Sequence, residues 1–156
     1  MLEGLDLLKN RGREACGLTD GSIVLLASSL PELKKQKANL KENLLAHNLH
    51  AMVDCIAQPL KGKGVLVANC EIYNWKELAE KKKLKAKNDA DLLLKLFDKE
   101  GVSEKTLDQL EGVYAFAYLK NNSLTLARDM LGVKPMWYSA TSGFSFASEK
   151  KVLKKW

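Results

Sequence analysis

The sequence has no hydrophobic run long enough to cross a bilayer. No apolar stretch among its 156 residues approaches the roughly 18 residues that a membrane-spanning helix needs. The first residues carry acids among their leucines and show no small-residue cleavage pattern, so they are unlike a secretory signal. We therefore expect a cytoplasmic protein without a membrane partner.

Cysteine and histidine are scarce, and their spacing argues against a metal centre. Cys16, Cys55 and Cys70 form no CxxC pair, and His47 and His50 are the only histidines. Tetrahedral zinc sites need four suitably spaced ligands of these types. An odd number of cysteines without an export signal also favours reduced thiols. We expect neither a metal site nor a disulfide.

Positive charge is abundant, but aromatic residues do not accompany it. The formal net charge is +6, and lysines cluster at Lys81–Lys85 and Lys150–Lys155. Such clusters can contact phosphates. No aromatic side chains interleave with them to form the stacking platform of a single-strand binder. A solvated surface is the favoured interpretation, and a weak RNA contact through these lysines is the alternative.

Hydrophobic patterning predicts strands toward both ends of the chain and helices between them. Repeats and low-complexity linkers are absent, so we expect one domain over residues 1–156. Strands on both sides of a helical region predict an α+β fold with mostly antiparallel sheets. The expected strands are 22–27, 44–53, 64–68, 113–118, 124–127, 137–138 and 144–147, and the expected helices are 2–10, 75–83, 88–100 and 106–110, with a helix or loop at 30–43.

The best helix signal begins at Asn88. Its side chain can cap the helix, and Asp89 and Asp91 lie in the electropositive first turn. Gly101 supplies a stop. Between these signals, Leu92, Leu93, Leu96 and Phe97 form one apolar face.

Several segments, taken in order, resemble the motifs of one known family. Residues 11–18 are similar to the family's RGPDxSG segment, residues 58–60 with 69–74 to QPL and NGEIYN, and residues 88–91 to SDTE. Residues 110–117, 127–135 and 146–149 match LxGMFAFA, ARDRLGIKP and FASE. The chain thus resembles the glutaminase-type domain of class II glutamine amidotransferases, nearest to asparagine synthetase.

The resemblance spans nearly the whole chain and implies a fold. It implies the four-layer αββα sandwich of N-terminal-nucleophile hydrolases, in which two mostly antiparallel sheets pack face to face between helices. Much of the match has a purely structural explanation. Core packing accounts for the Tyr114–Tyr118 and Phe144–Ala147 alternations, and a buried ion pair with a turn would account for Arg128 and Asp129.

The resemblance also implies a chemistry whose central groups are missing from the sequence as given. In the family, an N-terminal cysteine supplies the thiolate, and its own α-amine, with a pKa near 8, serves as the base. Here the sequence opens Met1-Leu2-Glu3, roughly at the helix that leads into the RGPD segment. We therefore assign no catalytic residue, and whether the chain is an enzyme stays uncertain at this level.

Four residues align with the family's glutamine site. Asn69 matches the asparagine whose amide helps to form the oxyanion hole, and Cys70 replaces the neighbouring glycine, a backbone donor. A Cβ there crowds the backbone if φ is positive. Glu71 and Asp89 match residues around the α-amino group of glutamine. We predict a remnant oxyanion hole at Asn69 and Cys70, and a remnant glutamine-binding site at Glu71 and Asp89.

A further alignment places Leu49 where the family has an arginine that clamps the substrate carboxylate. Leucine cannot make that bidentate contact. Two alternative nucleophiles stay open, namely Cys16 after cleavage behind Ala15 and a displaced thiol at Cys70. Buried, inert thiols are the favoured interpretation.

Three hypotheses follow. The leading one is an inactive glutaminase-type domain kept for binding or for assembly with an ATP-dependent amidating synthetase. The second is a fragment of an active amidotransferase that supplies ammonia, and the third is a basic RNA-associated module on the same fold. We expect no cofactor in this domain, since ATP and magnesium would belong to a synthetase partner. The oligomeric state is not predicted.

Overall fold

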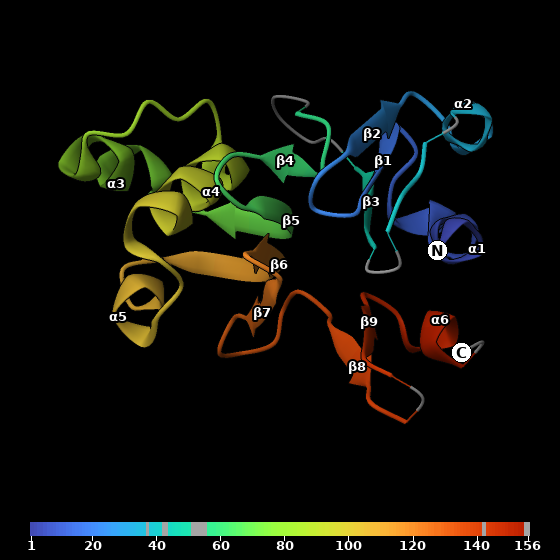
Figure 1. Ribbon diagram of the computed structural model, residues 1–156. Coiled ribbons are helices and arrows are strands. Elements are labelled where there is room, and N and C mark those ends of the chain that lie inside the picture. The colour runs from blue at the N-terminus through green and yellow to red at the C-terminus, as the bar shows by residue number, and fades with distance from the viewer. Residues whose placement is uncertain (37, 42–43, 51–55, 142, 155–156) are drawn as a thin grey trace. The chain divides into compact units, whose positions relative to one another are not determined.

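The computed structural model describes residues 1–36, 38–41, 44–50, 56–141 and 143–154 (Figure 1). The chain forms two compact units. Unit 1 comprises Met1–Pro59 and Pro135–Trp156, and unit 2 comprises Leu60–Lys134. Each is described by itself, and the single domain over residues 1–156 stays a prediction.

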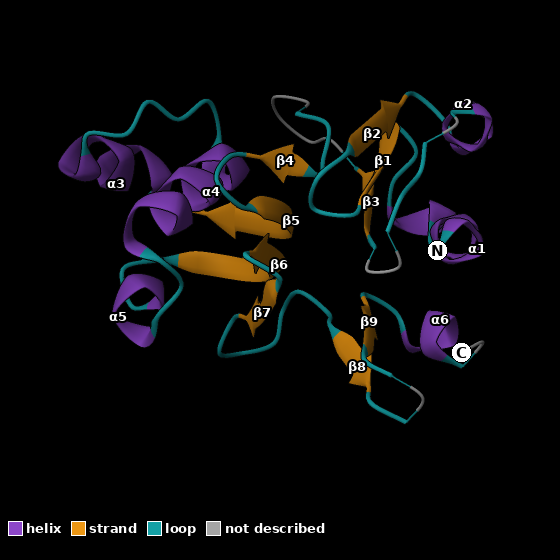
Figure 2. Cartoon of the chain, in the orientation of Figure 1, coloured by secondary structure: helices purple, strands orange, loops and turns teal. Residues whose placement is uncertain are grey.

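Unit 2 is one antiparallel sheet with helices (Figure 2). The strands lie in the order β4-β5-β6-β7, and each neighbouring pair is antiparallel. The longest ladder joins β5 to β6. The bounds are β4 Leu60–Lys61, β5 Val65–Ile72, α3 Trp75–Lys82, α4 Asp89–Glu100, α5 Glu104–Leu107, β6 Gly112–Lys120 and β7 Ser123–Arg128.

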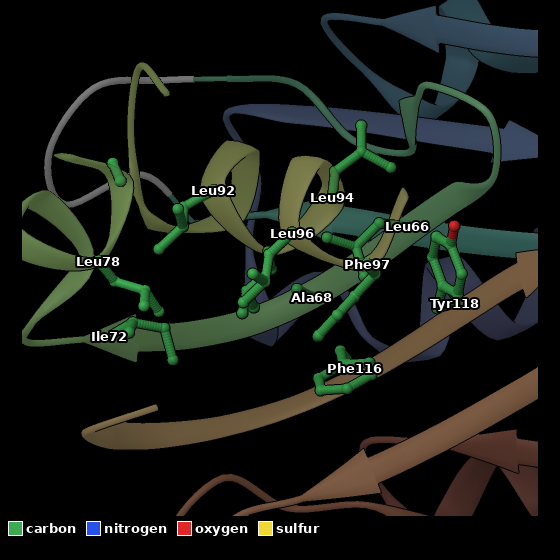
Figure 3. Packing of buried hydrophobic residues seen from close by; sticks show 12 residues of the cluster. Leu66, Ala68, Ile72, Leu78, Leu92, Leu94, Leu96, Phe97, Phe116 and Tyr118 are labelled. Carbon is green, nitrogen blue, oxygen red and sulfur yellow. The ribbon is translucent and has the colours of Figure 1, made fainter. Parts of the chain in front are cut away.

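Helix α4 supplies most of the core of unit 2. Figure 3 shows its apolar side chains against Leu66, Ala68 and Ile72 of β5 and Phe116 of β6. The Phe97 ring lies 4.8 Å from that of Phe116 and 5.6 Å from that of Tyr118, centroid to centroid. Six side chains of the helix are buried, namely Ala90, Leu92, Leu93, Leu94, Leu96 and Phe97.

The limits of α4 are those that the sequence predicts. The Asn88 side chain accepts a hydrogen bond from the backbone N–H of Asp91 at 2.9 Å, which caps the first turn. At the other end, Gly101 has φ = +78°, a conformation that residues with a Cβ rarely adopt. Local signals therefore define this helix at both ends.

The β6–β7 hairpin confirms another prediction. Asn121 and Asn122 both have positive φ, +50° and +63°, as the two central residues of a type I′ turn require. Asparagine tolerates this region better than most residues with a Cβ. The turn sets the register in which Ala115 lies opposite Arg128.

Unit 1 has a three-stranded antiparallel sheet in the order β2-β1-β3, with two helices on it. Its core joins Leu5 of α1 and Leu33 of α2 to Cys16 and Leu18 of β1. The bounds are α1 Leu2–Leu7, the 3-10 helix η1 Lys9–Arg11, β1 Ala15–Thr19, β2 Val24–Ala27, α2 Leu30–Lys35 and β3 Leu45–Leu49. The predicted strand at 44–53 is confirmed over Leu45–Leu49, the residues of β3. Its part at 51–53 lies outside the described residues.

One prediction about this sheet is wrong, and one of its strands was not predicted. The apolar run at 22–27 is not a buried strand, because β2 is an edge strand and Leu26 is 43% exposed. The unpredicted strand is β1, the central strand of the sheet, because its residues were interpreted only as part of a family motif. Gly17 in β1 is required for space, since a Cβ there would lie 2.1 Å from the carbonyl oxygen of Gln58.

The last part of unit 1 is a two-stranded sheet followed by a short helix. Strands β8, Trp137–Ser139, and β9, Ser145–Ala147, pair antiparallel, and α6, Lys150–Leu153, contacts both. Helix α6 was not predicted. The residue before α6 contacts η1, because the side-chain amide of Asn10 donates a hydrogen bond to the Glu149 carboxylate at 2.8 Å.

The turn between β1 and β2 depends on Asp20. One carboxylate oxygen accepts hydrogen bonds from the N–H groups of Ser22 and Ile23 at 2.8 and 2.7 Å, and the other accepts from Lys41 at 3.1 Å. These backbone donors lower the pKa of Asp20 to about 2. The charged carboxylate therefore stabilises the turn.

Truncation of the α4 core should be costly. We expect Phe97→Ala to lower the free energy of unfolding by about 3–5 kcal/mol, because it leaves a cavity among buried rings. The exposed change Lys105→Ala should cost less than about 0.5 kcal/mol. Urea unfolding followed by circular dichroism measures both. A loss below about 1 kcal/mol for Phe97→Ala would contradict this role.

The Asp20 turn should respond to acid. The folded-state pKa lies below the ordinary 3.8, so its contribution is fully present above about pH 4 and is lost as the pH falls toward 2. Asp20→Asn should therefore be less stable than the wild type at pH 6, with the gap closing between pH 4 and 2. Thermal unfolding across this range provides the measurement. A constant gap down to pH 2 would show that Asp20 does not titrate as described.

Candidate functional site

Strand β5 carries three of the four predicted site residues, but not on one face. Side chains alternate along a strand. Cys70 packs against the core beneath α4, next to Ala68 and Ile72. Asn69 and Glu71 therefore point to the opposite face of the sheet.

Asn69 is half-buried in the middle of the β5–β6 ladder, where it lies opposite Ala115. Among the described residues, none makes a hydrogen bond to its side chain. An amide in this position has both of its N–H donors available for a carbonyl or an oxyanion. The side chain of Asn69 thus has no competing hydrogen bond within the described residues.

Asp89 is the first residue of α4 and lies at the end of β5. Its Oδ2 accepts a hydrogen bond from the N–H of Ile72 at 3.2 Å, and its Oδ1 accepts one from the N–H of Ala90 at 2.8 Å. The carboxylate also lies in the electropositive first turn of the helix. Asp89 therefore fastens the start of α4 to β5.

The thiol of Cys70 contacts this same carboxylate. Burial raises the pKa of Cys70 well above its ordinary 9.0, and the negative charge of the Asp89 carboxylate raises it further. The ammonium of Lys134 opposes these effects only in part. The raised pKa favours the protonated form of the Cys70 thiol.

Glu71 is paired with Lys134, an interaction that the sequence did not reveal. The Lys134 ammonium donates to Oε1 of Glu71, whose side chain is 62% exposed. The two residues are far apart in the chain, so no local pattern signals their contact. Exposed ion pairs contribute at most about 1 kcal/mol, so Glu71 can exchange this partner for another cation at little cost.

The predicted buried ion pair of Arg128 and Asp129 is not what the structure contains. The Arg128 guanidinium is exposed and donates instead to the backbone oxygens of Gly132 and Lys134. Asp129 is buried, and its carboxylate accepts hydrogen bonds from the N–H groups of Val133 and Lys134 at 2.8 and 3.0 Å. Desolvation raises the pKa of Asp129, but these backbone donors outweigh it and leave the pKa lowered.

The remaining candidates from the sequence lie in unit 1. Cys16 is buried in the central strand, and burial raises the pKa of its thiol, so it is no activated nucleophile in the intact chain, and its exposure by cleavage after Ala15 stays a prediction. His50 is exposed and lies 3.4 Å from Glu14. Leu49, the substitute for the expected arginine, ends β3 opposite Ala15. Cys55 lies outside the described residues.

Metal ligands and membrane spans were also sought among the described residues. Within that part of the chain, no three His, Cys, Asp or Glu side chains are grouped as metal ligands would be. No helix there combines the length and apolar character needed to cross a bilayer.

Solved structures show the class of fold. Glutamine phosphoribosylpyrophosphate amidotransferase from B. subtilis, solved with ADP and GMP, matches 98% of this chain and 39% of its own with a TM-score of 0.79 at 22% identity. A structure described as the allosteric regulatory enzyme of purine biosynthesis gives a TM-score of 0.80. The predicted α+β fold of the N-terminal-nucleophile hydrolase type is confirmed.

Sequence comparison shows the family. The family model described as glutamine amidotransferase domain matches residues 34–156. The chain therefore belongs to the glutamine amidotransferase domain family. A protein of Methanocaldococcus jannaschii, provisionally named asparagine synthetase (glutamine-hydrolysing) 1, is 36% identical over 97% of this chain. A similarly named protein of Acanthamoeba polyphaga mimivirus is 32% identical over 97%. The chain spans 29% and 27% of these two relatives.

The raised thiol pKa values predict slow alkylation. Cys16 and Cys70 in the native protein should react with iodoacetamide at pH 7.5 at least about tenfold more slowly than in the urea-unfolded chain, because the thiolate is the reactive form. Peptide mapping by mass spectrometry assigns the label to each cysteine. Equal rates for Cys70 in the two states would contradict a protonated thiol at Asp89.

Proposed function

We propose that this glutaminase-type domain does not release ammonia from glutamine and serves in assembly with an ATP-dependent amidating synthetase. The observation that carries the proposal is the engagement of Asp89, whose carboxylate accepts hydrogen bonds from the backbone N–H groups of Ile72 and Ala90 at the start of α4. These contacts occupy an acid that the family resemblance assigns to the substrate, and burial together with this carboxylate raises the pKa of the Cys70 thiol.

The first supporting argument concerns the nucleophile. Glutamine hydrolysis in this family proceeds through a thiolate, and reactive cysteines have lowered pKa values. In the described part of the chain, Cys16 and Cys70 both have raised pKa values. Neither has the surroundings of an activated nucleophile.

The second argument concerns the substrate contacts. An acid that binds an α-amino group needs free oxygen lone pairs directed at the ligand. Asp89 already accepts hydrogen bonds from the N–H groups of Ile72 and Ala90. The Leu49 side chain, in addition, cannot clamp a carboxylate. Two of the groups that would orient glutamine are therefore engaged or replaced.

The proposed partner comes from the relatives. They are named as glutamine-hydrolysing asparagine synthetases, and this chain corresponds to less than a third of their length. A synthetase partner would hold the ATP and magnesium that amide synthesis requires, and this domain would hold no cofactor. Assembly in the cytoplasm is part of the same proposal.

The lysines do not favour RNA binding as the main role. The Lys82 ammonium pairs with Glu100 at 2.9 Å, and that of Lys95 pairs with Asp91 at 2.7 Å. Lys99 donates to the backbone oxygen of Lys82 at 2.8 Å. These contacts use part of the positive charge within unit 2, and an RNA contact stays a prediction.

The proposal is tested by a glutaminase assay on the purified 156-residue chain. We expect ammonia release from glutamine at the rate of a heat-inactivated sample, since the described thiols are protonated. A glutamine-hydrolysing enzyme serves as the positive control, and a Cys70→Ser variant as the matched control. Ammonia release clearly above background would refute the inactive state, and its loss in Cys70→Ser would identify the responsible thiol.

A further inference from the structure

The segment after β7 exposes apolar side chains. Met130 is 100% exposed, Leu131 is 87% exposed and Val133 is 55% exposed. These three residues lie within the 128–134 loop, defined here as Arg128–Lys134. Clustered exposed apolar residues are uncommon on proteins that act alone, and they often mark an interaction site.

The 128–134 loop is held in one shape by its own polar groups. Arg128 donates from Nε to the oxygen of Lys134 at 2.7 Å and from Nη2 to that of Gly132. The Asp129 carboxylate accepts from the N–H groups of Val133 and Lys134.

The backbone of this loop is anchored as well. The N–H of Asp129 donates to the oxygen of Tyr114 at 2.7 Å, and that of Gly132 donates to the oxygen of Asp129 at 2.9 Å. Gly132 has φ = +66°, and a Cβ there would lie 2.9 Å from the Arg128 guanidinium. The apolar side chains are therefore presented in a fixed arrangement, which lowers the entropy cost of binding a partner.

The loop is also connected to the candidate site. Its last residue, Lys134, pairs with Glu71, which lies on the same face of β5 as Asn69. A partner that covers the loop would therefore lie next to the one predicted site residue that keeps free donors.

We propose that Met130, Leu131 and Val133 are the docking surface for the synthetase, a proposal that rests on the proposed function. Two observations favour this occupant. The M. jannaschii relative matches 97% of this chain yet extends far beyond it, since the chain spans 29% of that relative. The surface is apolar, and the Arg128 guanidinium is turned onto loop carbonyls, as suits a lasting protein interface better than a nucleic acid.

The test measures binding of the 156-residue chain to a defined probe, the part of the M. jannaschii relative that lies beyond its match to this chain. Isothermal titration calorimetry compares the wild type with the double variant Met130→Ser/Leu131→Ser. Both side chains are exposed, so the variant should keep its fold, which circular dichroism checks. We expect a loss of affinity of about tenfold or more, because apolar anchors dominate such interfaces.

The matched control is Ile23→Ser/Leu26→Ser, which removes two exposed apolar residues from the β1–β2 region of unit 1. We expect it to bind the probe as the wild type does. Equal binding by all three proteins would overturn the docking surface and leave assembly with a synthetase standing. Absence of binding by all three would overturn both.

Two further outcomes separate the proposals. Self-association of the wild type in analytical ultracentrifugation, lost in Met130→Ser/Leu131→Ser, would replace the synthetase with a second copy of this chain as the occupant. Ammonia release together with weakened probe binding by that variant would refute the inactive state and support the docking surface.

Discussion

The burial of helix α4 on strands β5 and β6 is the interaction on which the candidate site depends. Burial of one large apolar side chain stabilises a fold by about 1.5–3 kcal/mol, and Leu92, Leu93, Leu96 and Phe97 are all completely buried. This packing brings the first residue of the helix, Asp89, to the end of β5. The position of the acid that was predicted to bind the substrate is thus a result of hydrophobic packing.

The carboxylate that fixes the start of α4 is also one that the glutamine-site prediction names, so its structural role competes with ligand binding. A carboxylate at a helix start is stabilised by backbone N–H donors, and Asp89 has two of them. Each contact stabilises the junction of α4 with the sheet, and each leaves less of the carboxylate for a ligand. Asn69, on the other face, takes no part in this competition.

Much of the fold was predictable where the signals are local. The cap at Asn88, the apolar periodicity of α4 and the asparagine turn at 121–122 each lie within a few residues, and all three are confirmed. Strand β1 was missed, because its residues match a family motif that draws attention away from their extended pattern. The run at 22–27 looked buried, but the position of a strand within a sheet depends on distant partners.

The candidate site was predictable in its residues and not in its geometry. Asn69, Cys70, Glu71 and Asp89 were found by alignment, and whether they bind glutamine stays a prediction. Their division between two faces follows from the exact extent of β5, which reaches Ile72, beyond the predicted end at Ala68. The Lys134–Glu71 pair joins segments that only the folded chain brings together.

Gly17 has a consequence for how such families are recognised. Its position in the RGPDxSG-like segment leaves room for the carbonyl of Gln58, and any side chain would collide there. The requirement is steric, so it holds equally for a family member that hydrolyses glutamine and for one that does not. A sequence motif built on such positions identifies the fold. Genome surveys that rely on such a motif therefore count proteins that share the fold, whether or not those proteins catalyse the reaction.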